Sequence, residues 1–154
     1  MKLEKWALFA EIAGAVAVVV SVLYVGIEVR QNSATLRSAS VQAVSDSLTD
    51  FTASVARDAD TAYIWNTGLQ QGLDSLNADE RGRFNLLMVA MVRRMENVFF
   101  QYREGFIPDE QWHGLQTGND YILLSPGGRQ WWANPGVQSL YSQSFREFIK
   151  TRAE

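Results

Sequence analysis

The sequence contains no cysteine, one histidine and only three prolines among its 154 residues. The lack of cysteine excludes disulfides, thiol catalysis and thiolate metal sites. Because His113 is the single histidine, the common zinc ligand sets are excluded as well. Glu110 and His113 form one E-x-x-H pair, whereas di-iron carboxylate bundles use that pair twice. We therefore expect neither a metal nor another cofactor.

The chain also lacks an excess of positive charge, with 14 basic and 17 acidic residues and a formal net charge of −3. A nucleic-acid partner is therefore not expected. The acid pairs at 79–80 and 109–110 stand where helices are expected to begin, and acids are favourable there. The glycine turn at 125–129 lacks the lysine of a phosphate loop. No residue set in the chain predicts an enzyme.

Proline is absent before Pro108, so long helices can form without a break. Residues 6–27 are 22 mostly apolar residues with Glu11 as the sole charge. As a helix they span roughly 33 Å, enough for a bilayer core of about 30 Å. A cleavable signal peptide has a shorter apolar run and a small-residue cleavage site, which the sequence after Gly26 does not match. The pattern predicts a retained transmembrane anchor at 1–30 and a soluble helical domain at 31–154.

Small residues recur along the predicted membrane helix at spacings of 3, 4, 3 and 4, and so form a stripe on one side. Such stripes allow close approach of helix backbones in lipid, where packing drives association. The stripe predicts a helix–helix interface, although an Ala/Val-rich span also produces such spacings by chance. Its members are Ala7, Ala10, Gly14, Ala17 and Ser21.

Glu11 lies five residues inside Trp6 and about 80° from the centre of the small stripe, at about 100° per residue. A carboxylate inside a membrane is costly and usually faces a partner, a bundle interior or water. An interface role, snorkelling to the headgroups and an ion-conducting role all remain open for this residue.

The remaining sequence predicts an all-α fold with a soluble bundle of four or five helices. The membrane helix is expected to continue without a break into the first helix of this bundle. Residues 41–55 carry a narrow apolar seam, expected to pack on the broad apolar face of 84–102 in the same chain. Asn77 and Glu80 predict a capping box, Gly105 a helix end, and Ser144 with Glu147 a second capping box. Ser125 is expected to cap the short segment 129–133. A break is expected at residues 118–119 and a turn at residues 134–136. The seam consists of Val41, Val44, Leu48, Phe51 and Val55.

Two groups in the predicted domain have a structural and a functional interpretation. A solvated helix face is expected at Arg93, Arg94, Glu96, Arg103 and Glu104, with an anion-binding or partner surface as the alternative. The aromatic residues of the C-terminal third are expected to form a core, with a ligand cage as the alternative. They are Trp112, Trp131, Trp132, Phe145 and Phe148.

Three stretches resemble a group of small bacterial single-pass membrane proteins with a helical C-terminal domain: EIAGAVAVVVSVLYVGIEVRQNSATLRS, FxxLMxxxxRRMENVFFQYREG and SPGGRQWW. No activity is associated with that group. The resemblance implies a bacterial inner-membrane location. Lys2 and Lys5 before the span nearly balance Arg30 and Arg37 after it, and we favour a cytoplasmic C-terminal domain.

The first functional hypothesis is a non-enzymatic, self-associating membrane scaffold or accessory subunit that uses its helical domain for interaction. Its partners would be the bilayer, further copies of the chain or a larger membrane complex. The alternative is a small homo-oligomeric channel with Glu11 at or near the pore. A ligand-binding or enzymatic domain of unknown type is the third.

Overall fold

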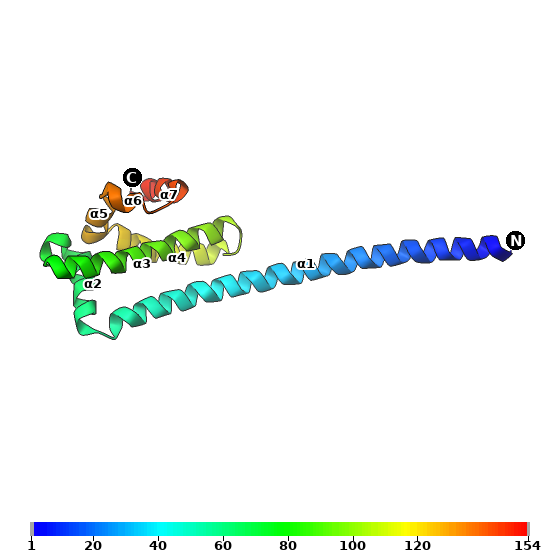
Figure 1. Ribbon diagram of the computed structural model, residues 1–154, viewed down its shortest axis with the longest axis horizontal. Coiled ribbons are helices and arrows are strands. Elements are labelled where there is room, and N and C mark those ends of the chain that lie inside the picture. Colours follow the sequence, from blue (N-terminus) through cyan, green and yellow to red (C-terminus); the bar gives the residue numbers. More distant parts are fainter. Residues whose placement is uncertain (1, 154) are drawn as a thin grey trace. The chain divides into compact units, whose positions relative to one another are not determined.

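The computed structural model describes the backbone of residues 2–153 and the side chains of Trp6 and residues 11–152. The described chain is all-α, as predicted, and contains no strand (Figure 1). Its elements are α1 (Lys2–Ala56), α2 (Ala59–Gln71), the short 3-10 helix η1 (Leu73–Ser75), α3 (Ala78–Arg103), α4 (Asp109–Leu123), α5 (Pro126–Trp132), α6 (Pro135–Gln138) and α7 (Gln143–Ala153).

The chain divides into two compact units, residues 1–39 and residues 40–154. The second unit holds the hydrophobic core and includes the last part of α1. The predicted boundary between residues 30 and 31 marks the end of a membrane anchor, which is a different property and stays a prediction.

The core of the second unit is built around α3. This helix begins with the predicted capping box: the Asn77 side chain accepts from the Glu80 N–H at 3.0 Å, and Glu80 accepts from the Asn77 N–H at 2.8 Å. It ends in a Schellman motif at Gly105, whose φ of +75° a glycine adopts at little cost. Between these ends the predicted apolar face is buried. Its fully covered members include Phe84, Met88, Met95 and Val98, and Val92, which was not predicted to belong to this face, is buried beside them.

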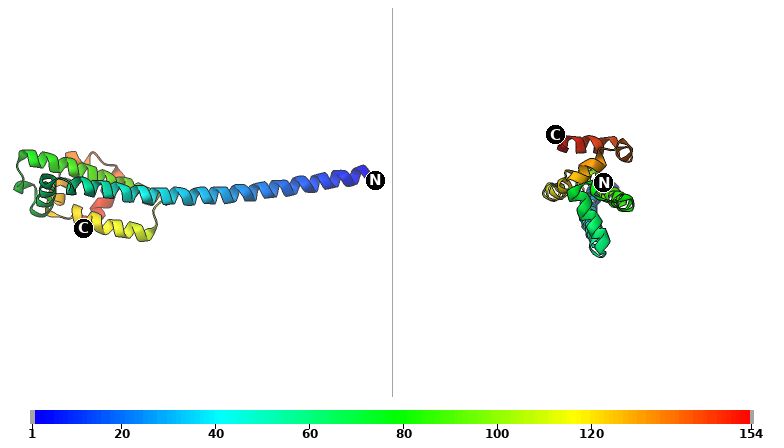
Figure 2. Two further views of the ribbon diagram at one scale, coloured as in Figure 1. Left: turned by 90° about the horizontal axis from the view of Figure 1, so that it is seen from below. Right: turned by 90° about the vertical axis from the view of Figure 1, so that its left-hand side faces the viewer.

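Aromatic side chains fill the space where the end of α3 meets α4 and α7, as predicted. The Phe99 ring lies 4.9 Å from that of Phe148 and 5.6 Å from that of Phe145. Tyr102 stacks on Trp112 at 4.3 Å, with the rings nearly parallel. Figures 1 and 2 show α7 on the far side of α3 from residues 40–56 of α1. The bundle therefore has α3 in its middle.

Helix α5 packs backbone to backbone on α2. A Cβ atom added at Gly127 would lie 1.9 Å from the Gly68 carbonyl oxygen, so only glycine allows this crossing. Ser125 caps α5 by accepting from the Gly128 N–H at 3.0 Å, as the sequence predicts. Trp131 then enters the core, and its Nε1 donates to Asn85 of α3 at 2.8 Å. The crossing fixes α5, and with it the adjoining end of α4.

The apolar seam of α1 joins its own chain's core, although more loosely than α3 does. Val44 and Val55 are buried, and the Phe51 ring meets Trp65 of α2 edge to face at 5.2 Å. Trp65 in turn lies 5.9 Å from Phe84. Leu48 keeps 37% of its surface exposed. Phe51 therefore reaches the α3 face through α2.

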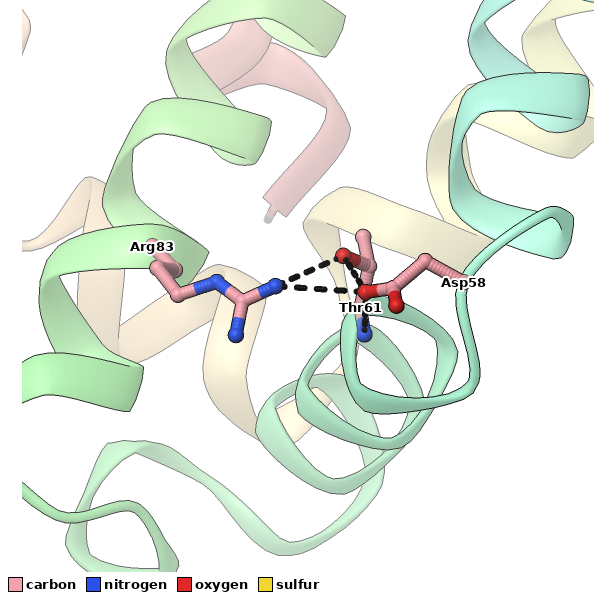
Figure 3. A network of polar contacts seen from close by, with 3 residues as sticks. All are labelled: Asp58, Thr61 and Arg83. Atoms are coloured by element: carbon pink, nitrogen blue, oxygen red, sulfur yellow. Dashed lines mark hydrogen bonds and ion pairs between the residues drawn. The ribbon is translucent and has the colours of Figure 1, made fainter.

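A polar network holds the turn between α1 and α2 against α3 (Figure 3). Asp58 caps α2 by accepting from the Thr61 N–H at 2.8 Å. Arg83 of α3 donates to Asp58 at 3.3 Å and to the Thr61 hydroxyl at 2.8 Å. The hydrogen bonds from Thr61, together with Arg83, lower the pKa of Asp58.

Three local predictions in the C-terminal part are wrong. The last helix begins at Gln143, where the Ser142 hydroxyl accepts from the Phe145 N–H at 3.4 Å, so Ser144 is not the cap. Glu147 instead accepts from Gln143 at 2.8 Å. The expected turn at 134–136 opens the short helix α6, because the Asn134 side chain caps Gly136. Helix α4 passes residues 118–119 without a break.

The expectation of a solvated face at Arg93, Arg94 and Glu96 is wrong for Glu96, which is 7% exposed. Its carboxylate accepts from the Ser142 N–H and from Arg93, both at 2.7 Å. Burial by itself would raise the pKa of Glu96, but the bonds from Ser142 and Arg93 outweigh burial and leave the pKa lowered. Glu96 therefore joins α3 to the start of α7. Arg94, half-buried, donates to Ser47 of α1 at 3.2 Å.

Truncating Phe51 to alanine should destabilise the bundle by about 2 kcal/mol. This is below the 3–5 kcal/mol typical of a fully buried phenylalanine, because Phe51 is only partly covered. Leu48→Ala, in the same seam but more exposed, is the matched control and should cost less than about 1 kcal/mol. Thermal or urea unfolding followed by circular dichroism measures both. Equal losses in the two variants would contradict the packing described.

Acid should weaken the joint between α3 and α7. Because folding lowers the pKa of Glu96, its stabilising contribution is complete above the unfolded pKa, about 4.3. It disappears as the pH falls through the lower, folded pKa. Glu96→Gln should therefore cost about 1.5–3 kcal/mol near pH 7. The difference in unfolding free energy between wild type and variant should shrink towards pH 3. Urea titrations of the two proteins, done in parallel at each pH, measure this difference. A cost that does not change with pH would show that the ionised carboxylate is not the stabilising form.

Candidate functional site

The first half of α1 carries the predicted site, and its apolar side chains lie on every face of the helix. Large apolar residues from Ile12 to Ile27 keep between 53% and 65% of their surface exposed. An apolar helix of this kind is covered either by a core or by lipid. No part of its most apolar 18-residue window, of mean hydropathy 2.3, is buried within the chain. The helix is thus long and apolar enough to cross a membrane.

The small stripe is open along the part that the structure describes. At Gly14 an added Cβ atom would meet nothing within 4 Å. The Ser21 hydroxyl donates to the Ala17 carbonyl at 2.8 Å, so it needs no partner from another chain. Gly14, Ala17 and Ser21 fall within about 60° of one another around the helix. The side chains of Ala7 and Ala10 lie outside the described residues.

Glu11 is exposed and lies three residues before Gly14, about 60° around the helix. From there a carboxylate can reach the edge of a contact centred on the small stripe, but not its middle. Beyond the apolar segment, hydroxyls turn back onto their own helix: Ser33 donates to Val29 at 2.9 Å and Thr35 to Gln31 at 3.0 Å. Gly14, Ala17, Ser21 and Glu11 lie on neighbouring faces of α1. All four are exposed, so the structure does not identify what contacts them.

The other chemical groupings considered from sequence do not form a chemical site among the described residues. Glu80 completes a cap, and Asp109 accepts from the Tyr102 hydroxyl at 3.1 Å, which raises the pKa of that tyrosine. Glu110 and His113 are both exposed on α4. Within the described residues, no three His, Asp or Glu side chains gather as metal ligands would.

The sequence interpretation missed a groove on the bundle, between α7 and the α4–α5 corner. Two adjoining hollows of about 260 and 400 Å³ share Trp132 and Ile149 as walls. Arg129 of α5 and Arg152 of α7 line the smaller hollow, and Arg146 and Lys150 of α7 line the larger one. The alternation of Arg146, Lys150 and Arg152 with apolar residues along α7 was the one signal in the sequence, and it is common on exposed helices.

The chain was compared with protein-family models, with curated proteins and with solved structures, and none of them matches it. Its function is therefore inferred from its own residues.

Proposed function

We propose that the chain is a non-enzymatic membrane protein that is anchored by the first half of α1 and self-associates there. The helical domain serves as an interaction module, so that the protein acts as a scaffold or accessory subunit. The observation that carries this proposal is the apolar surface of residues 12–27, exposed on all sides of α1.

Self-association is supported by the shape of that surface. In lipid there is little hydrophobic drive between helices, so close packing of small side chains supplies much of the attraction. Gly14 has open space around it, and the Ser21 hydroxyl is already satisfied. A second helix can therefore approach this stripe without leaving a polar group unpaired.

The role of interaction module is supported by how the domain uses its polar groups. Asp58, Glu96 and Asp120 each pair with an arginine from another helix, or from another turn of the same one. The pairs of Asp58 with Arg83 and of Asp120 with Arg152 position separate helices against one another. Several apolar side chains stay exposed on the bundle, among them Tyr63, Leu86 and Tyr121.

We place the protein in the bacterial inner membrane, with the helical domain in the cytoplasm. The location follows from the resemblance of the N-terminal and central stretches. The basic residues on the two sides of the span nearly balance, which gives the orientation little support from charge.

A small homo-oligomeric channel is the second candidate, and Glu11 is the observation that favours it. A carboxylate within an apolar span usually faces a partner or water. Its position on the flank of the stripe, rather than at its centre, agrees better with contact at the edge of an interface than with a pore axis.

Leucine at Gly14 should hold the two helix backbones apart and weaken self-association by about tenfold or more, equivalent to about 1.4 kcal/mol. Gly26→Leu is the matched control, because Gly26 also has open space around it but lies about 120° away around the helix. Chemical crosslinking of the protein in membranes, at several expression levels, measures the change in self-association. Circular dichroism verifies that the helical domain of each variant is folded. An unchanged crosslinking ladder in Gly14→Leu, or equal loss in both variants, would contradict the stripe interface.

Glu11→Gln should be tolerated better than Glu11→Leu, because the amide retains hydrogen-bonding groups for a neighbouring helix. We expect a small change in crosslinking for glutamine and a several-fold loss for leucine. Planar-bilayer recordings of the purified chain separate the two candidate functions. A current that disappears in Glu11→Gln would favour the channel, and its absence together with the expected crosslinking order would favour the scaffold.

A further inference from the structure

The groove between α7 and the α4–α5 corner combines an apolar floor with a basic rim. Leu123 and Ile149, at 7% and 6% exposure, form the deepest part of its floor. Leu124, Trp132 and Ala133 complete the smaller hollow of about 260 Å³. Leu123 and Ile149 are recessed, whereas Leu124 and Trp132 are half-buried and Ala133 is exposed. The groove therefore offers its deepest contact to a narrow apolar group that can enter it.

The rim carries more positive than negative charge. Four basic residues line the two hollows against two acidic ones, and the basic ones are Arg129, Arg146, Lys150 and Arg152. Arg152 is held in place by Asp120, to which its Nε donates at 2.9 Å and its Nη2 donates as well. The side chain of Arg129 is exposed and makes no hydrogen bond or ion pair with another described residue. One cation is thus fixed beside the apolar floor, and another is free to turn towards a ligand.

This combination selects for a molecule with one apolar chain and one anionic end. Burying the chain on Leu123, Trp132 and Ile149 would gain roughly 25 cal/mol per Å² of apolar area. A carboxylate at the mouth can take two parallel hydrogen bonds from a guanidinium, the geometry that arginine favours. A cationic or purely apolar molecule would lack one of the two contributions.

The size and depth of the groove favour a free single-chain acid over a bilayer lipid. Both hollows lie at or near the lower end of the range for ligand pockets, so one short chain fills them. A flat bilayer surface cannot reach Leu123 and Ile149, which are less than a tenth exposed, unless a lipid chain leaves the bilayer. The charged side chains on both edges also stand between the floor and any flat surface.

We propose that this groove binds a free medium-chain fatty acid, with its chain on Leu123, Trp132 and Ile149 and its carboxylate at Arg129. Nothing in this proposal depends on self-association through α1.

The test is binding of octanoate to the full chain in nanodiscs of zwitterionic lipid, by titration calorimetry with empty nanodiscs subtracted. Octanoate is short enough to remain largely in water. We expect saturable binding of one molecule per chain. Octylamine, of the same length and opposite charge, should bind at least tenfold more weakly.

Arg129→Gln should weaken octanoate binding by about tenfold, whereas Arg81→Gln, an exposed arginine on α3, should leave it unchanged. Ala133→Phe should block the hollow without touching the rim charge, and circular dichroism verifies that each variant folds. The proposal is overturned if octanoate shows no saturable binding. It is equally overturned if neither Arg129→Gln nor Ala133→Phe weakens binding, or if Arg81→Gln weakens it as much as Arg129→Gln. Arg129-dependent capture of anionic vesicles without octanoate binding would assign the groove to a bilayer lipid instead.

Discussion

The apolar surface of α1 between Ile12 and Ile27 is the constraint on which the rest of the structure depends. Its large side chains are exposed all round the helix. Keeping ten such side chains in water would cost on the order of 10–20 kcal/mol. That is comparable to the whole stability of a domain. This helix is long and apolar enough to cross a membrane, which would cover such a surface on every side at once.

Residues 40–154 form a compact unit with a hydrophobic core of its own. This core is built on one long helix, α3. The flexible methionine side chains on its buried face can fill irregular gaps between the shorter helices. Buried ionic and polar groups then set where the shorter helices lie. Glu96 determines where α7 begins, and the Gly68–Gly127 contact determines how closely α5 approaches α2.

Local signals in the sequence predicted much of this fold. Asn77, Ser125 and Gly105 act through neighbours within a few residues, so their cap and end positions could be inferred without any tertiary information. Ser142 could not be distinguished from Ser144 in this way, because the choice between them depends on Glu96, which lies 46 positions away. The same distance concealed the burial of Glu96 itself. A charge on a helix looks solvated until its partner on another helix is known.

The candidate functional features also divide into those that local sequence predicts and those that depend on tertiary contacts. The small stripe and Glu11 follow from spacing along one helix, and the structure keeps Gly14, Ala17 and Ser21 on one face. Their partner is not encoded within this helix. The groove beside α7 was missed because Leu123, Trp132 and Ile149 come from three helices and meet only in the folded bundle.

The most direct measurement of the central claim is the number of chains per particle after extraction of the full-length protein straight from membranes into native nanodiscs. Native mass spectrometry or mass photometry provides this number. The account predicts recovery in the nanodisc fraction, with two or more copies in each particle. Recovery outside the nanodiscs would contradict the membrane anchor, and particles with a single copy at every protein concentration would contradict self-association through α1.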